Sequence, residues 1–330
     1  MGKKLVSIVI PVFNEEGNLP VLYERLSAVL KMLATDYELL FVNDGSRDQS
    51  LALLKSYADR DAHIKIIDLS RNFGHQLAVT AGLDHCQGDC AVIIDADLQD
   101  PPELIPDFIT HWKEGYDVVY ATRIAREGET VIKKATARAF YRLMQKVGRV
   151  RIPENTGDYR LLSRRSVDSL RQLREHHRFM KGLFAWIGYP QKSVPYQRDA
   201  RYAGKTKWNY WKLWNFAIEG ITSFTTTPLK LATYLGLVTA LGAFLYGSYF
   251  LLRTLFLGNP VPGYPSLLVT MLFIGGIQLV AIGIIGEYLG RMFNETKNRP
   301  LYFLKGYEPS VSRRTSELSS RTQQKNTSPE

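Results

Sequence analysis

The sequence has little cysteine, and it lacks the ligand spacing of a zinc site. Its 330 residues contain two cysteines, Cys86 and Cys90, and no second cysteine or histidine pair that could complete such a site. Both cysteines lie beside an expected buried strand. We therefore expect two reduced, structural thiols in a cytoplasmic domain.

Two glycine-rich motifs that bind phosphate groups are also missing. No G-x-G-x-x-G follows the first expected strand, and G-x-x-x-x-G-K-[ST] does not occur. A phosphate group would therefore have to be held by a metal ion and by basic side chains. We expect a first strand rather than a signal peptide at the N-terminus, because the apolar run after Lys3 and Lys4 is short and contains Pro11.

Acidic side chains are in the minority. The chain carries 42 lysine and arginine residues against 32 aspartate and glutamate residues, which gives a net charge of +10. An excess of this size indicates an anionic partner. Composition alone leaves nucleic acid, a phosphorylated substrate and an anionic membrane open.

Apolar runs of strand length alternate with segments of helical apolar spacing over the first 122 residues. The pattern predicts strands at residues 5–13, 37–42, 64–69, 91–97 and 117–122. Helices are expected between them, at 19–33, after a cap at Ser46 or Asp48, at 74–85 and at 102–114. This alternation is typical of an α/β fold with a mainly parallel sheet and helices on both faces.

The fourth expected strand ends in a group of oxygen-bearing side chains. Asp95 and Asp97 are two residues apart, so they share one side of an extended chain, and Gln99 continues the row. Glu15 and Asp44 follow the first two strands, at the edge where open α/β sheets bind ligands. Carboxylate and amide oxygens suit Mg²⁺ or Mn²⁺. The alternative is a strand end that carries solvated acids.

The second half of the chain indicates a membrane. Residues 131–150 are basic and amphipathic, which suits an anionic membrane surface, the alternative being an ordinary surface helix. Three tryptophans follow in an expected interface helix at 208–228. Two nearly uncharged runs, at about 229–252 and 266–287, are each long enough to span a membrane as a hairpin. Two buried helices of a soluble protein are the alternative.

The charges that flank these two runs predict their orientation. The connecting loop has one basic residue, Arg253, whereas the outer ends carry four, namely Lys230, Arg291, Lys297 and Arg299. The positive-inside rule therefore places residues 1–207 and the tail of 291–330 in the cytoplasm. We expect disorder from about residue 310. Glycines in the runs permit close helix packing, so a homo-oligomer can form.

Two further features lie between the expected sheet and the tryptophans. Asp158 stands just before a strand-like segment, RLLS. Residues 194–207 form a basic loop around Gly204 that includes Arg201 and Lys207. A mobile loop of this composition can close over a diphosphate, and the alternative is a plain solvated loop.

Several separate motifs, in one order, carry a resemblance to a known family. Four of them resemble the nucleotide-sugar domain of family-two glycosyltransferases, which has the GT-A (Rossmann-like) fold: VSIVIPVFNEEGNLP, FVNDGSRD, RNFGHQLAVTAGL and DADLQDPPE. Four more narrow the resemblance to the polyprenyl-phosphate glycosyltransferases, which include enzymes that glucosylate bactoprenol: NTGDYRLLSR, RFMKGLFAWIG, GKTKWNYWKLWNFAIEGITSF and IGIIGEYLGR. The resemblance runs from about Val6 to Pro300. The Q-x-x-R-W motif of processive polysaccharide synthases is absent.

On the donor side, the resemblance implies a metal and nucleotide-sugar site. Asp95 and Asp97, with Ala96 between them, match the metal-binding D-x-D motif, and Gln99 matches a third ligand of related dolichyl-phosphate mannosyltransferases. The nucleoside would be bound by residues that match the family's base, ribose and nucleoside contacts, namely Pro11, Phe13, Glu15 and Asp44.

On the acceptor side, the resemblance implies a catalytic carboxylate and basic side chains. Asp158 matches the carboxylate proposed as catalytic, and Arg123 matches a basic position near the acceptor phosphate. Lys134 and Arg138, in the basic amphipathic stretch, are expected beside the same phosphate. Two residues match the loop that closes on the diphosphate and assists catalysis, namely Arg201 and Lys207.

Such an enzyme is expected to move a hexose, glucose from UDP-glucose, onto undecaprenyl (bactoprenyl) phosphate by an inverting displacement that requires Mg²⁺ or Mn²⁺. Its setting would be the bacterial inner membrane, crossed twice, with both termini in the cytoplasm. Its product would serve cell-envelope or O-antigen glycosylation, with no nucleic-acid partner. GDP-mannose, UDP-N-acetylglucosamine and UDP-aminoarabinose remain alternative donors. A non-catalytic membrane sensor or scaffold for nucleotide sugars is an alternative of another class.

Overall fold

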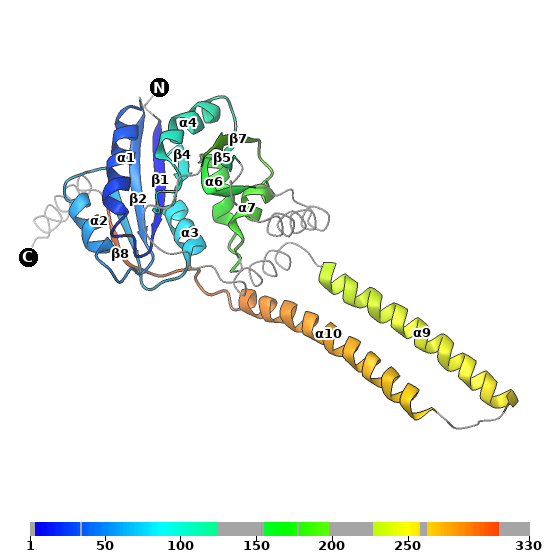
Figure 1. Ribbon diagram of the computed structural model, residues 1–330. Coiled ribbons are helices and arrows are strands. Elements are labelled where there is room, and N and C mark those ends of the chain that lie inside the picture. The colour runs from blue at the N-terminus through cyan, green and yellow to red at the C-terminus, as the bar shows by residue number, and fades with distance from the viewer. Residues whose placement is uncertain are drawn as a thin grey trace, which may run out of the picture.

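A mixed β-sheet forms the centre of the protein. The computed structural model describes residues 4–33, 35–124, 153, 155–176, 178–197, 227–257 and 263–309. Within these residues the strands lie in the order β7-β5-β6-β4-β1-β2-β3-β8 (Figure 1). The pairs at the centre of this order are parallel, and antiparallel pairs occur toward both edges. The expected α/β class is confirmed.

Four parallel strands form the part of the sheet that the apolar runs predicted. They are β1 (Leu5–Val12), β2 (Asp36–Asn43), β3 (Ile64–Leu69) and β4 (Cys90–Ile93). Almost every residue in them is buried, because helices cover both faces, and this explains the continuous apolar runs. Val12 pairs with Asn43 and Val9 with Ile93, so β1, β2 and β4 end toward the same edge of the sheet.

Helices cover the two faces of the sheet in two groups, each with its own apolar core. One face packs against α1 (Leu19–Lys31), α2 (Ser50–Ala58) and α4 (Ile105–Lys113), which follows the short helix η1 (Pro102–Leu104). The other face packs against α3 (His75–His85), α6 (Arg164–Gln172) and α7 (Met180–Trp186). α2 starts later than expected, after Gln49, although Asp48 Oδ1 accepts a 3.0 Å hydrogen bond from the N–H of Ser50.

The remaining strands on the β4 side correct two expectations. β6 (Thr156–Ser163) lies between β4 and β5 (Val118–Arg123) and is antiparallel to both, while β7 (Gln191–Tyr196) pairs with β5. Asp158 therefore lies inside a strand rather than before one. Residues 194–196 belong to a strand rather than to a loop. Polar side chains interrupt both segments, which hid their strand character in the apolar pattern.

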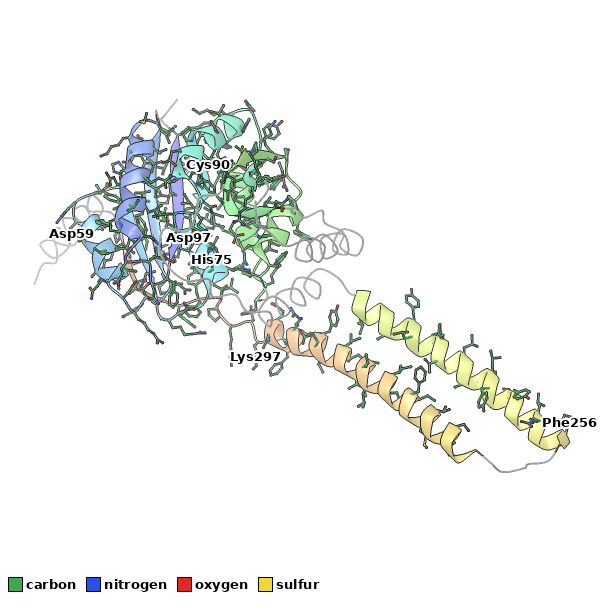
Figure 2. All side chains as sticks on the ribbon, viewed as in Figure 1. Asp59, His75, Cys90, Asp97, Phe256 and Lys297 are labelled. Carbon is green, nitrogen blue, oxygen red and sulfur yellow. The ribbon has the colours of Figure 1, made fainter. Side chains whose placement is uncertain are left out.

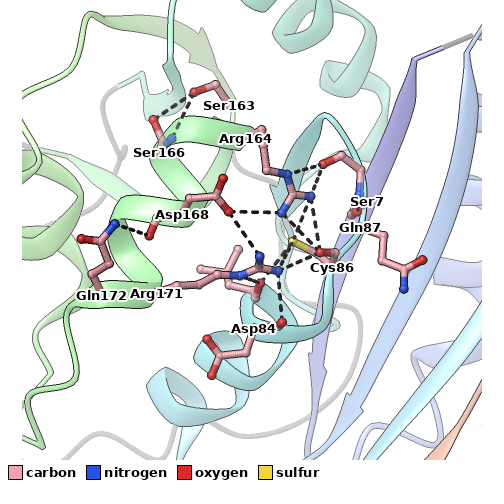
Figure 3. Close-up of polar contacts among 12 residues, drawn as sticks. Ser7, Asp84, Cys86, Gln87, Ser163, Arg164, Ser166, Asp168, Arg171 and Gln172 are labelled. Carbon is pink, nitrogen blue, oxygen red and sulfur yellow. Dashed lines mark hydrogen bonds and ion pairs between the residues drawn. The ribbon is translucent and has the colours of Figure 1, made fainter. Parts of the chain in front are cut away.

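Two arginines of α6 hold the end of α3 that is remote from the expected site. Arg171 Nε donates to Leu83 O at 2.9 Å, and Arg164 Nε donates to Gly88 O at 2.8 Å (Figure 3). Both guanidinium groups thus bind carbonyls at the end of α3 and just beyond it, as cations commonly do. Cys86 and Cys90 are buried nearby as free thiols, as predicted.

A buried ion pair joins β2 and β3. The Glu38 carboxylate accepts hydrogen bonds from Lys65 Nζ and Ser7 Oγ, and at 2.7 Å from the N–H of Gln87. Glu38 is 3% exposed and Lys65 is 7% exposed. The charge of each buried side chain is therefore compensated by a partner and by further hydrogen bonds.

Two long helices follow, α9 (Thr227–Leu257) and α10 (Tyr264–Thr296). They pack against each other and extend away from the α/β domain (Figure 1). Large apolar side chains such as Val238 and Leu279 are about 70% exposed along them. Among the described residues, one helical stretch, Phe273–Thr296, is long and apolar enough to cross a membrane. The surface suits lipid better than water.

The chain then returns to the sheet, which the sequence did not predict. β8 (Leu304–Glu308) is antiparallel to β3 and forms the edge of the sheet. Tyr302 Oη donates to Asp84 Oδ2 at 2.9 Å, and the N–H of Ser70 donates to Phe303 O at 2.9 Å. The expected cytoplasmic tail of 291–330 thus contains a strand, at residues 304–308, that its sequence pattern did not indicate. Residues 310–330, where disorder was expected, lie outside the described part.

Candidate active site

The acidic segment after β4 has the alternation that the sequence predicted. Asp95, Asp97 and Gln99 are partly exposed, whereas Ala96 and Leu98 between them are buried. The strand itself ends earlier than expected, at Ile93. Leu98 has a φ of 62°, which is costly for a side chain with a Cβ, and the N–H of Gln99 donates to Asp97 Oδ1 at 3.2 Å. This turn presents three oxygen-bearing side chains on one side of the chain.

His75, the first residue of α3, joins this acidic segment to β6. Its Nε2 lies 2.8 Å from Asp95 Oδ1, and its Nδ1 lies 3.7 Å from Asp158 Oδ2. Burial lowers the pKa of His75, but the two carboxylates outweigh burial and raise that pKa to about 9. The ring therefore carries a positive charge at neutral pH. His75 is not among the predicted site residues, although it stands in the motif RNFGHQLAVTAGL at the start of an expected helix.

Asp158 reaches the site from β6. β6 pairs with β4, with Ile93 opposite Arg160, and this pairing brings Asp158 to the same edge as Asp95. Asp158 Oδ1 is buried, and none of the residues that the structure describes forms a hydrogen bond with it. Arg160 is buried below it, where its Nη2 donates to Gly157 O at 2.7 Å and desolvation lowers its pKa to about 10. Burial lowers the pKa of Lys181 in α7, and the negative charge of Asp158 opposes part of this decrease.

Asp44 follows β2 and holds the backbone that leads into α3. It is 2% exposed, and its two oxygens accept hydrogen bonds from the N–H groups of Phe73 at 2.7 Å and Gly74 at 2.9 Å. Gly74 has a φ of 101°, a conformation that favours glycine. Burial raises the pKa of Asp44, and these hydrogen bonds oppose the rise. Its expected contact with a nucleoside stays a prediction.

The three residues expected around the nucleoside base and ribose lie at the end of β1. Pro11 is a buried residue of β1, and Phe13 is partly exposed just beyond the strand. Glu15 Oε2 accepts a 2.6 Å hydrogen bond from Asn18 Nδ2, and the N–H of Glu15 donates to Ser50 Oγ at 2.9 Å. The loop after β1 is thus tied to the start of α2.

Arg123 ends β5 on the far side of β6. Its Nε donates to Tyr196 Oη at 3.2 Å, and Tyr196 Oη donates to Asp100 Oδ1 at 2.6 Å. Burial and the Asp100 carboxylate raise the pKa of Tyr196 to about 12. Arg123 therefore belongs to a chain of polar groups near the acidic segment. The other expected basic residues lie outside the described part, namely Lys134, Arg138, Arg201 and Lys207.

The D-x-D motif implies a divalent cation, and the donor set fits one. Asp95, Asp97 and Gln99 offer only oxygen atoms from one side of the chain, which suits Mg²⁺ or Mn²⁺. Across the residues that can be described, no group of three or more His, Cys, Asp or Glu side chains forms a complete metal site. Such an ion would therefore take its remaining ligands from water and from substrate phosphates.

Comparison with known proteins shows the family to which the chain belongs. Residues 7–171 match the model of glycosyl transferase family 2, and residues 227–292 match the GtrB C-terminal hairpin. The chain belongs to glycosyltransferase family 2, and it is a glycosyltransferase.

Its relatives are similar over nearly their whole length. The SfII prophage-derived bactoprenol glucosyl transferase of Shigella flexneri is 47% identical over 300 residues, which are 91% of this chain and 97% of that protein. An uncharacterized glycosyltransferase of Synechocystis, sll0501, is 53% identical over 299 residues, 91% of this chain and 94% of that one. The prophage bactoprenol glucosyl transferase homolog of Escherichia coli K12 is 46% identical over 300 residues.

Proposed function

We propose that the protein transfers a hexose, glucose from UDP-glucose, to undecaprenyl phosphate and so makes a lipid-linked sugar for cell-envelope or O-antigen glycosylation. The observation that carries this proposal is the meeting of Asp95, Asp158 and His75 at one edge of the sheet, in a chain that is 47% identical to a bactoprenol glucosyl transferase. The transfer proceeds in a single displacement. An oxygen of the acceptor phosphate attacks the anomeric carbon, the bond to the diphosphate breaks, and the configuration inverts.

Asp95, Asp97 and Gln99 would hold the metal ion. When bound, Mg²⁺ or Mn²⁺ neutralises the negative charge that develops on the leaving diphosphate. Arg201 and Lys207 would add positive charge to the same group. Pro11, Phe13, Glu15, Asp44 and Ala96 would line the nucleotide-sugar site.

Asp158 orients a basic partner in this mechanism rather than removing a proton. A phosphate monoester has a second pKa of about 6, so the acceptor is already ionised at neutral pH and scarcely needs a base. Among the described residues, the His75 ring lies 3.7 Å from Asp158 Oδ2. Asp158 thereby helps to position the His75 ring beside Asp95.

We further propose that α9 and α10 both cross the bacterial inner membrane, with the α/β domain and both termini in the cytoplasm. The exposed apolar surface of both helices supports this arrangement. The matching GtrB C-terminal hairpin over residues 227–292 supports it as well. A lipid acceptor then meets the active site at the depth of the headgroups, beside the expected interface helix of 208–228 and the amphipathic stretch of 131–150.

The test is transfer of radiolabel from a panel of UDP- and GDP-sugars to undecaprenyl phosphate, with the full chain purified in detergent and Mg²⁺, Mn²⁺ or EDTA added. Metal-dependent glucosyl transfer that Asp97→Asn abolishes is the expected result. Transfer from GDP-mannose or UDP-N-acetylglucosamine alone would keep the mechanism and replace the sugar. UDP binding without transfer from any donor would favour a nucleotide-sugar sensor.

A further inference from the structure

A buried tyrosine links the acidic segment to the arginine at the end of β5, and the proposed mechanism gives it no role. Tyr196, the last residue of β7, is 4% exposed. Its Oη donates to Asp100 Oδ1 at 2.6 Å and accepts a 3.2 Å hydrogen bond from Arg123 Nε. Asp100 comes directly after Gln99 in the sequence. One hydroxyl group thus joins the segment proposed to hold the metal ion to a cationic side chain on another strand.

The surroundings of this hydroxyl fix the direction of both hydrogen bonds. Burial and the Asp100 carboxylate raise the pKa of Tyr196 to about 12, so the hydroxyl stays protonated at neutral pH. Arginine can only donate, so the hydroxyl accepts from Arg123 and gives its single hydrogen to Asp100. Asp100 is 2% exposed, and Tyr196 lies opposite Arg123 in the parallel pairing of β7 with β5. The two contacts therefore hold the base of the guanidinium group in one place.

A glycine on β6 makes room for the rest of the guanidinium group. Gly157 precedes Asp158, and a Cβ added to it would come within 3.0 Å of Arg123 Nη2. That distance is shorter than side chains normally keep, so a larger residue at this position would displace the guanidinium group. Gly157 therefore lets Arg123 lie against the backbone of β6, one residue from Asp158.

Arg123 is a cation that is placed to meet a substrate. Burial lowers its pKa, but the hydrogen bond to Tyr196 and the charges of Asp100 and Asp95 outweigh burial and raise that pKa. Its side chain is partly exposed, and its Nε is bonded to a neutral hydroxyl rather than to a carboxylate. Arginine is well shaped to bind phosphate groups. Both substrates of the proposed reaction carry such groups, the donor a diphosphate and the acceptor a monoester.

We infer that Tyr196 is a positioning residue that, anchored by Asp100, holds the guanidinium group of Arg123 over Gly157 so that it binds a phosphate group of a substrate. The inference rests on the proposed transfer from a nucleotide sugar to a lipid phosphate. Tyr196 is not among the predicted site residues, and it stands in the segment of 194–207 that the sequence predicted to be a basic loop.

Two tyrosine variants of the full chain in detergent test this role by steady-state kinetics. Tyr196→Phe removes the hydroxyl and keeps the ring. Tyr159→Phe is the matched control, because Tyr159 is also buried and its Oη donates to Pro101 O at 2.7 Å, next to Asp100. Each variant loses one buried hydrogen bond to the same segment. We expect Tyr196→Phe to raise the KM for one substrate about fivefold, as for the loss of one hydrogen bond, and Tyr159→Phe to leave both KM values within about twofold.

The substrate whose KM rises identifies the phosphate group. A higher KM for undecaprenyl phosphate assigns Arg123 to the acceptor, and a higher KM for the nucleotide sugar assigns it to the donor diphosphate. Gly157→Ala displaces the guanidinium group in another way, and we expect it to raise the same KM. An equal rise in Tyr159→Phe would overturn the inference, as would unchanged KM values in both Tyr196→Phe and Gly157→Ala. Thermal unfolding checks that the variants fold, and Gly157→Ala decides the question if Tyr196→Phe does not.

A double-variant comparison separates positioning from a loss of packing. Arg123→Met removes the guanidinium group. If Tyr196 acts through Arg123, adding Tyr196→Phe to Arg123→Met should change the KM by less than about twofold. A further rise of about fivefold in that background would show that Tyr196 acts independently of Arg123, and would overturn the inference.

Binding measured without transfer distinguishes a failure of this inference from a failure of the proposed function. Calorimetry with a short-chain prenyl phosphate, and separately with UDP and Mg²⁺, needs no sugar transfer. We expect Tyr196→Phe to bind one of these two probes about fivefold more weakly than wild type does. Equal binding of both probes by the two proteins would overturn the inference. Wild type that binds both probes but transfers no sugar would sink the proposed function, and weaker binding by Tyr196→Phe would still support the positioning role.

Discussion

Asp158 could act as a general base or as a residue that orients a neighbouring side chain, and the size of its effect on the rate distinguishes these two roles. A general base typically contributes a factor of about 10²–10⁴ to the rate, whereas a residue that orients a neighbour contributes less. We expect Asp158→Asn to lower kcat about tenfold, because the acceptor is already ionised and the variant keeps the shape of the side chain. Measurement of kcat between pH 6 and 9 checks this, with Asp107→Asn on the exposed face of α4 as control. A loss of a thousandfold or more would identify Asp158 as the base.

The raised pKa of His75 predicts how stability depends on pH in metal-free protein. The pKa is about 9 in the folded state against a usual 6.5, so the contact stabilises fully below pH 6.5 and is lost as the pH rises through 9. We expect wild type to unfold at a higher temperature than His75→Gln in EDTA at pH 6, and the difference to vanish near pH 10. The ring is partly exposed, so the gain is at most about 1 kcal/mol. A difference that stays constant with pH would show that the ring is not charged.

The buried ion pair of Glu38 and Lys65 joins β2 to β3. Removing one partner shows how much a buried, unpaired charge lowers the free energy of unfolding. Lys65→Met leaves the Glu38 carboxylate buried without its cation, so we expect the free energy of unfolding to fall by about 3–5 kcal/mol. Replacing both residues, Glu38→Leu with Lys65→Met, should recover most of that loss. Urea unfolding followed by circular dichroism gives the values. A double variant as unstable as the single one would mean that the pair itself stabilises the sheet.

β8 gives a second prediction at the level of elements. Gly306 pairs with Asp68 and Leu304 with Leu69, so Lys305 is the extra residue of an irregularity in the pairing of β8 with β3. The pair Lys305→Pro and Gly306→Pro removes both N–H donors from this part of β8. We expect the amides of β3 to exchange hydrogen at least tenfold faster. The control pair Lys305→Ala and Gly306→Ala keeps both N–H groups. Unchanged exchange in the proline variant would show that β8 is dispensable for the sheet.

The elements that the sequence predicted differ physically from those that it did not. β1 to β4 are buried on both faces and pair with strands close in the chain, so their apolar runs identify them. β8 lies at the edge, carries polar residues and pairs with a strand more than 200 residues earlier, which no local pattern reveals. The same limit applies to the site. Asp95 and Asp97 are two residues apart in the sequence, whereas His75 and Asp158 come from α3 and β6 and lie close to Asp95 only in the folded chain.

The orientation of the whole molecule in the membrane can be tested by labelling single cysteines introduced on its surface. Both native cysteines are buried, so they do not interfere with the labelling. Cys86 and Cys90 are buried, and burial raises the pKa of both, so they should not react with a maleimide. Phe256 and Lys297 lie at opposite ends of the helix pair (Figure 2). In right-side-out vesicles, Phe256→Cys should react with an impermeant maleimide, and Lys297→Cys should react only after the vesicles are opened. Equal labelling of both would contradict two crossings.

The return of the chain to β3 has a consequence for how the protein is made. Until the ribosome has released residues 304–308, β3 presents an unpaired edge, and such edges invite pairing with other chains. The strand that closes this edge is synthesised after α9 and α10. The sheet of the α/β domain can therefore be completed only once both helices have left the ribosome.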